Sequence, residues 1–176
     1  MAHIEKKGYA QLELNAAAFR RSGRIEAQCK IADGIEYLEN GMLLAVNNIK
    51  RQVEFVKEGN AHLPVALNYT SEHMYDNRAN GLKDFKLEPN SFLPRLGYLG
   101  DGDKYTTNCV AYDEGTYTTE EALWAAINAV ETTPLYAVPA EDGYHMITDS
   151  AEGAVAMVLC ESTMPDGQKA VKFQAL

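Results

Sequence analysis

The sequence predicts a mainly β protein, an antiparallel β-barrel or sandwich with one helix, a long loop and an extended N-terminal arm. Short alternating or continuous apolar stretches recur along the 176 residues, and turn pairs such as Asp33-Gly34 and Asn40-Gly41 separate them. Only residues 118–131 place apolar side chains at helical spacing over several turns. No segment repeats with a period of about 20–50 residues, so a solenoid is not expected.

The chain divides into an arm, residues 1–24, and a single β-rich domain, residues 25–176. Tyr9–Leu14 alternates over a short length, which predicts an edge strand or an extended arm. The alternation breaks after it, where two arginines follow a phenylalanine. Arg24–Ala32 has the clearest strand pattern of the protein, because its apolar and polar residues alternate strictly.

Further strands are expected at short intervals. Ile49–Val56 is ambiguous between a strand, which its β-branched residues favour, and a short helix. A tight Gly-Asp-Gly-Asp turn between Arg95–Leu99 and Lys104–Tyr112 predicts a β-hairpin. Ala154–Cys160 is nearly all apolar and is therefore expected to be central, and the alternating C-terminal residues are expected to pair in a sheet. The other expected strands are Ile35–Leu38, Met42–Val46, Val65–Tyr69, Leu135–Val138, Tyr144–Thr148 and Lys169–Leu176.

The helix at about 118–131 has a capping box at its start. Thr118 is expected to be the N-cap and Glu121 the third helical residue, whose side chain would reach back to the cap. Pro134 follows the last turn and ends the helix.

Residues 70–94 are expected to form a long loop. No periodicity holds there, and asparagine, glycine and proline recur. The large apolar residues of this stretch nevertheless require a packing surface, which belongs to the protein itself or to a neighbour.

The net charge of −9 is distributed unevenly. Residues 1–30 carry +3 and the rest of the chain −12, and residues 105–168 contain eleven Asp and Glu but no Lys or Arg. Such a body repels nucleic acid and anionic lipid, so neither is expected as a partner. No apolar run approaches the ~18 residues of a membrane span, and no apolar signal region follows the first lysines. Synthesis in the cytoplasm is therefore expected.

The cysteines and histidines give no metal or redox signature. Cys29, Cys109 and Cys160 lie far apart in apolar or alternating runs, which is typical of reduced, buried thiols. The four histidines lack metal-ligand spacing. Cys109 or Cys160 could in principle pair with His145 as nucleophile and base, but both cysteines are expected to face the core, where a thiol is inert.

The Asp101-Gly102-Asp103 turn resembles the start of an EF-hand calcium loop. The sixth position of that loop requires glycine but is Thr106, and the twelfth requires glutamate but is Tyr112. A surface turn is the better interpretation. We therefore predict no catalytic residue, no cofactor and no metal. Ten tyrosines and the single Trp124 leave two interpretations open, a sugar-binding surface around Tyr98–Tyr117 or a protein interface.

Three stretches carry a family resemblance: Leu96–Leu99 running into Gly102–Asn108, Tyr136–Pro139, and Met164–Ala170. Together they resemble small auxiliary structural proteins of tailed bacteriophages, the capsid decoration or cement class. The resemblance covers mostly residues 92–176. It implies a non-enzymatic, β-rich body on the outer capsid of the virion, with an arm that reaches neighbouring capsid subunits. The implied partners are the major capsid protein and/or copies of the protein itself, in a homo-oligomer or bound to the lattice.

A basic arm on an acidic body would suit an acidic protein shell. Arginines and aromatic residues are the usual anchors of such contacts. Three alternatives remain open: an arm that folds back on its own body, a carbohydrate- or ligand-binding module of a phage head or tail fibre, and a small enzyme with an unrecognised site. The expected partner-binding residues are Phe19, Arg20, Arg21 and Arg24 in the arm and Met74, Tyr75, Phe85 and Phe92 in the loop.

Overall fold

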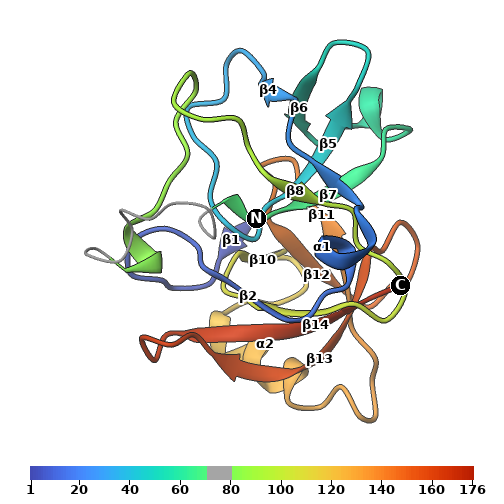
Figure 1. Ribbon diagram of the computed structural model, residues 1–176. Coiled ribbons are helices and arrows are strands. Elements are labelled where there is room, and N and C mark those ends of the chain that lie inside the picture. The colour runs from blue at the N-terminus through green and yellow to red at the C-terminus, as the bar shows by residue number, and fades with distance from the viewer. Residues whose placement is uncertain (71–80) are drawn as a thin grey trace.

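The computed structural model describes residues 1–70 and 81–176, and it shows two β-sheets in a sandwich-like arrangement that does not close into a barrel (Figure 1). The mainly β prediction is confirmed. The elements are β1 (Ala2–His3), β2 (Leu12–Ala16), α1 (Phe19–Ser22), β3 (Ile25–Glu26), β4 (Lys30–Ile31), β5 (Leu43–Asn47), β6 (Gln52–Phe55), η1 (Glu58–Asn60), β7 (Val65–Asn68), η4 (Leu82–Asp84), β8 (Leu96–Gly97), β9 (Lys104–Thr107), β10 (Val110–Tyr112), α2 (Glu120–Ile127), β11 (Tyr136–Pro139), β12 (His145–Thr148), β13 (Ala156–Thr163) and β14 (Lys169–Ala175).

The larger sheet has the strand order β1-β10-β12-β11-β13-β14-β9-β2. Its pairs are antiparallel except β10 with β12, which run parallel. β13 and β14 form a long antiparallel ladder that runs from Ala156 opposite Ala175 to Thr163 opposite Lys169. The expected central position of Ala154–Cys160 is thereby confirmed, and so is the paired C-terminus.

The smaller sheet has the order β3-β8-β7-β5-β6-β4, with β4 parallel to β6 and the other pairs antiparallel. The ambiguous Ile49–Val56 stretch contains strand β6. Its neighbour β5 is buried on both faces, so Leu43 and Leu44, whose side chains point to opposite faces, belong to two different core clusters.

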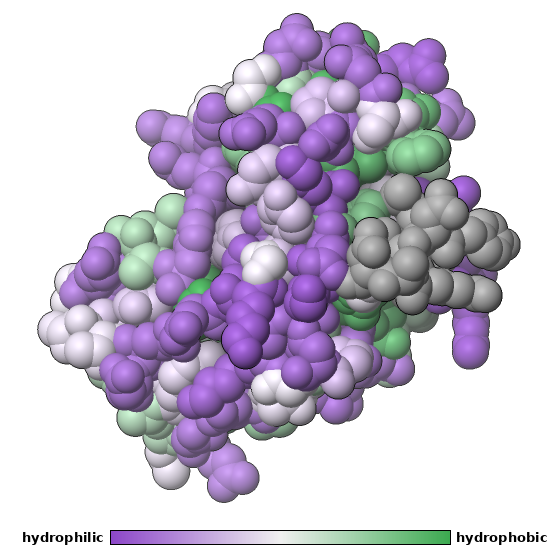
Figure 2. Space-filling view, turned by 90° about the vertical axis from the view of Figure 1, so that its left-hand side faces the viewer, coloured by the Kyte–Doolittle hydropathy of each residue, from purple (hydrophilic) through white to green (hydrophobic). Residues whose placement is uncertain are grey.

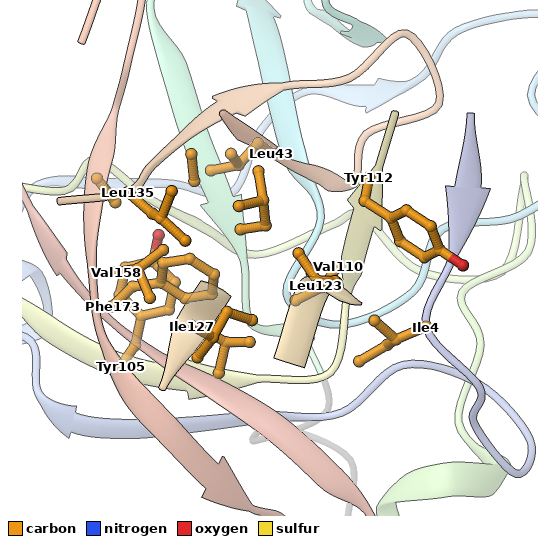
Figure 3. Close-up of a cluster of buried hydrophobic side chains, with 14 of the residues drawn as sticks. Ile4, Leu43, Tyr105, Val110, Tyr112, Leu123, Ile127, Leu135, Val158 and Phe173 are labelled. Atoms are coloured by element: carbon orange, nitrogen blue, oxygen red, sulfur yellow. The ribbon is translucent and has the colours of Figure 1, made fainter. Parts of the chain in front are cut away.

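The first core cluster joins both sheets to helix α2 (Figure 3). Phe173 and Val158 reach it from the larger sheet and Leu43 from the smaller one, while Leu123 and Ile127 fill it from the helix. All five side chains are nearly or fully buried. Their burial on several elements at once explains why the apolar face of α2 is held against the sheets.

The prediction of a β-hairpin at residues 95–112 is wrong. β8 pairs with β3 and β7 in the smaller sheet, whereas β9 pairs with β14 and β2 in the larger one. The Gly-Asp-Gly-Asp turn is therefore the point at which the chain changes sheets. It is fixed there by the C-terminal strand, because the N–H of Gly102 donates to the carbonyl of Ala175 and the N–H of Ala175 donates to the carbonyl of Asp103.

The prediction of a single strand at Arg24–Ala32 is also wrong, because the segment contains two short strands, β3 and β4. β3 and β4 lie at opposite edges of the smaller sheet, so this segment crosses the sheet instead of running along it. The Glu26 carboxylate accepts a hydrogen bond from the N–H of Gln28 at 2.6 Å and turns the chain between the two short strands. The expected strand Ile35–Leu38 is reduced to an isolated bridge between Leu38 and Leu87.

Helix α2 is shorter than expected and begins one residue later. Its N-cap is Thr119, whose hydroxyl accepts from the N–H of Ala122, and not Thr118. Glu121 is consequently the second helical residue and forms no capping box. The Glu120 carboxylate instead bonds Trp124 Nε1 at 2.8 Å and the N–H of Glu5 at 2.7 Å, so it joins the helix to the N-terminal segment.

Residues 1–24 do not extend away from the body. β1 pairs with β10 and β2 pairs with β9, and Ile4, Ala10 and Leu12 are buried. The alternative of an arm folded back on its own body therefore describes this structure, because the apolar residues of the arm have a sheet to pack against.

Candidate protein-binding surface

The arm ends in a strand, a short connection and a single helical turn, α1 (Figure 1). Gly23 ends this turn in the left-handed region, at φ 72°, which glycine adopts without strain. An open groove of about 750 Å³ follows the same segment. We call it the β2-edge groove; it is lined by Leu14, Asn15, Ala16, Ala17, Ala18, Arg20 and Arg21.

Phe19 is a core residue, which corrects its expected role as a surface anchor. Its side chain is fully buried and packs against Tyr69, with 5.0 Å between the ring centroids. It also lies directly over Gly97, where an added Cβ would overlap the ring. Phe19 therefore cannot contact a partner in this conformation. It fixes α1 to the body, and the exposed Arg20 and Arg21 follow it on the same turn.

Asp103 also fixes the segment around α1 to the body. Its buried carboxylate accepts hydrogen bonds from the N–H of Ala18 at 2.7 Å and of Gly100 at 3.0 Å, and it forms an ion pair with Arg24 at 3.2 Å. The expected surface turn is thus anchored inside the protein at its fourth residue. Arg24, expected to bind a partner, has an internal partner in this carboxylate.

Charge distinguishes the β2-edge groove from the rest of the surface. Among the described residues that line it, Arg20 and Arg21 are charged and none is acidic. The chain as a whole carries −9. On the face that lies to the left in Figure 1, the surface is mostly hydrophilic, with only small and separate apolar areas (Figure 2). The groove is consequently a local positive site on an acidic protein.

The long loop contributes less to the surface than its composition predicts. Phe85 is buried in the second core cluster, so it is not available to a partner here. Phe92 is 63% exposed, and Leu93, which sequence reasoning missed, is 50% exposed. Met74 and Tyr75 lie outside the described residues.

A polar cluster that the sequence did not reveal fastens the N-terminal segment to the body. The buried Glu39 carboxylate accepts hydrogen bonds from Lys6 Nζ at 2.9 Å, from the Tyr144 hydroxyl at 3.0 Å and from the N–H of Ala10. Burial, together with the Cys109 thiol and Glu39, raises the pKa of Tyr144 well above its usual value. Each polar group of this cluster is occupied within the protein, which makes it a structural clasp.

The clasp continues to the surface at His3. Its Nε2 lies 2.7 Å from Asp142, and its ring stacks on Tyr144 at a centroid distance of 4.0 Å. Burial acts to raise the pKa of Asp142, but the hydrogen bonds from His3 and from the N–H of Tyr144 outweigh it and hold that pKa below its ordinary value.

His145 does not form a nucleophile and base pair with Cys109 or Cys160. The fully buried His145 bonds the carbonyl oxygen of Cys109 and the Tyr105 hydroxyl. Burial lowers the pKa of His145 to about 3 and raises that of the Cys109 thiol. Cys160, expected to face the core, is exposed on β13, while Cys29 is buried as expected.

The region proposed as a sugar-binding surface is largely closed. Tyr105 is fully buried, and Tyr112 and Tyr117 are at most 8% exposed, so these tyrosines form no open aromatic platform. Within residues 1–70 and 81–176, no group of three or more His, Cys, Asp or Glu side chains could hold a metal ion. In the same part of the chain, no helix has the length and apolar character needed to cross a membrane.

Comparison with protein-family models, with curated proteins and with solved structures found no match for this chain.

Proposed function

We propose that this protein is a non-enzymatic structural protein of a tailed bacteriophage that decorates and stabilises the capsid by binding the major capsid protein. The observation that carries the proposal is the β2-edge groove, a positively charged open site on a protein of net charge −9. The sequence resemblance to capsid decoration proteins indicates which kind of partner such a site would meet. On this proposal the protein is a component of the virion.

The charge layout suits a protein that docks in one orientation. Arg20 and Arg21 would face an acidic capsid surface. The acidic remainder of the chain would be repelled by that surface, so other orientations of the protein would be disfavoured. Arginine is enriched among the residues that dominate protein interfaces, since its planar head bonds carboxylates at two points. Phe19 and Asp103 hold the segment in place before binding, so little ordering entropy is lost on docking.

Co-sedimentation with undecorated capsids tests this proposal. The wild-type protein should bind saturably, at a fixed ratio to capsid subunits, and Arg20→Glu/Arg21→Glu should weaken the binding strongly. Lys30→Glu/Arg51→Glu is the matched control, because it reverses two exposed charges at the far edge of the smaller sheet, around β4. The control should bind as the wild type does.

Two outcomes would contradict parts of the proposal. If the wild type does not bind capsids at all, the decoration role is wrong. If it binds and both double variants bind equally well, the capsid role stands and the β2-edge groove is not the contact.

A further inference from the structure

The four sheet edges differ in length in the part of the chain that the structure describes. β1, β3 and β4 end their sheets as strands of two residues each, whereas β2 ends the larger sheet as a strand of five. Very short edge strands are one way in which proteins avoid pairing with other chains. β2 is the edge that lacks this protection.

The groove follows the edge of β2 and not one of its faces. Successive side chains of a strand point to opposite faces of the sheet. The groove is nevertheless lined by five consecutive residues, 14–18. Among the described residues, the lining includes none from β9, the strand beside β2, so the groove runs along the outer edge of the sheet and not across one of its faces.

The side chains along this edge leave room for another backbone. Three consecutive alanines, 16–18, line the groove, and paired strands must approach to about 4.7–4.9 Å. Two residues, Leu14 and Asn15, stand where the register with β9 shifts between Glu13 and Ala16, so the regular ladder is interrupted there. A strand added to this edge would therefore be short and would need further anchors.

The arginines supply those anchors and select the charge of the occupant. Arg20 and Arg21 line the end of the groove beyond the alanines, and both arginines are exposed; in the part of the chain that the structure describes, the lining of the groove contains no acidic residue. A carboxylate-bearing segment matches this site, while a positively charged one would be repelled. Nucleic acid also carries anionic groups, but the −12 carried by the chain after residue 30 repels a long polyanion.

We infer that the β2-edge groove binds a short, extended, acidic peptide segment of a partner protein, which adds to the larger sheet as a strand beside β2 and places its carboxylates on Arg20 and Arg21. Main-chain hydrogen bonds hold the segment and the arginines select its charge. This inference rests on the proposed function only for the source of the segment, which would be the major capsid protein.

A peptide array tests the inference without capsids. The array carries short peptides in which Val, Thr or Ile alternates with Asp or Glu, and the same peptides with Lys in place of the acids. The purified protein should bind the acidic peptides and not the lysine peptides. Arg20→Glu/Arg21→Glu should reduce the binding about tenfold or more, and Lys30→Glu/Arg51→Glu should leave it unchanged.

Backbone methylation separates strand addition from simple charge attraction. Peptides methylated at alternate main-chain nitrogens keep their carboxylates but lose the N–H groups of one edge, so their binding should be abolished. In hydrogen exchange, the acidic peptide should also slow the exchange of main-chain amides in residues 13–17 of the protein.

The outcomes distinguish this inference from the capsid role. If no acidic peptide binds, or if methylated peptides bind as well as unmodified ones, strand addition at β2 is refuted. Peptide binding together with absent capsid binding supports the edge site and refutes the capsid as its partner.

Discussion

The buried His145 should make the free energy of unfolding fall in acid, and this fall tests whether the ring is neutral and buried in the core. Its Nδ1 faces the Cys109 carbonyl oxygen at 3.1 Å, so Nδ1 donates, and Nε2 accepts from the Tyr105 hydroxyl at 2.9 Å. Both ring nitrogens are thus satisfied in the neutral form. Burial lowers the pKa of His145 from 6.5 to about 3. Burial also raises the pKa values of Tyr105 and Cys109 from 10.0 and 9.0, so neither neighbour titrates in acid.

The sign and size of the effect follow from proton linkage. The folded pKa is depressed, so the unfolded chain takes up a proton below pH 6.5 that the folded protein does not bind until about pH 3. Stability is therefore complete above pH 6.5 and falls as the pH is lowered. Each pH unit below 6.5 costs about 1.4 kcal/mol, which amounts to about 2 kcal/mol between pH 7.5 and pH 5.

The assay is urea unfolding at a series of pH values for the wild type and for His145→Gln. Glutamine can bond the same two partners but does not titrate, so the free energy of unfolding of the variant should fall by about 2 kcal/mol less between pH 7.5 and pH 5. The other titrating groups act equally in both proteins and cancel. Parallel pH profiles would refute the reasoning. So would an NMR titration of the wild type in which the His145 ring titrates near its ordinary pKa of 6.5.

Three further predictions concern packing and burial. Cys160 should react promptly with a thiol reagent at neutral pH, whereas the two buried cysteines should react only on unfolding. Gly97→Ala should cost roughly 1–3 kcal/mol because its Cβ would overlap the buried aromatic ring above it, and Gly59→Ala, with nothing within 4 Å, should change stability by less than about 0.5 kcal/mol. Glu39→Gln should cost roughly 3 kcal/mol in urea unfolding, because it removes a buried carboxylate that is the counter-charge of the mostly buried Lys6, while the exposed Glu114→Gln should be nearly neutral.

Sequence patterns located the strands better than they located their partners. Val65–Tyr69 and the C-terminal strand were predictable because their apolar spacing is local. The sheet to which a strand belongs depends on residues far along the chain. Arg95–Leu99 and Lys104–Tyr112 have the spacing of a hairpin, yet the C-terminal strand binds the turn between them and separates the two strands into different sheets.

The same limit applies to the candidate site. The arginine pair was predictable as an exposed cluster from its local context, and Arg20 and Arg21 are exposed. The burial of Phe19 depends on the space above Gly97, which no neighbour in the sequence indicates. Glu39 adjoins a turn dipeptide and would be expected in solvent, but Lys6 and Tyr144 meet it from distant parts of the chain.

Folding the arm onto the body changes how it would bind. A free arm loses conformational entropy when it docks, at about 1–2 kcal/mol for each backbone residue that becomes ordered. Here the segment around α1 is already held by Phe19 in the core and by Asp103 at the N–H of Ala18. This ordering cost is therefore met when the protein folds, and it would not have to be met again when the segment binds a partner. On the proposed function, Arg20 and Arg21 would form a prearranged docking site on the acidic protein, and the partner, not this chain, would supply the extended segment.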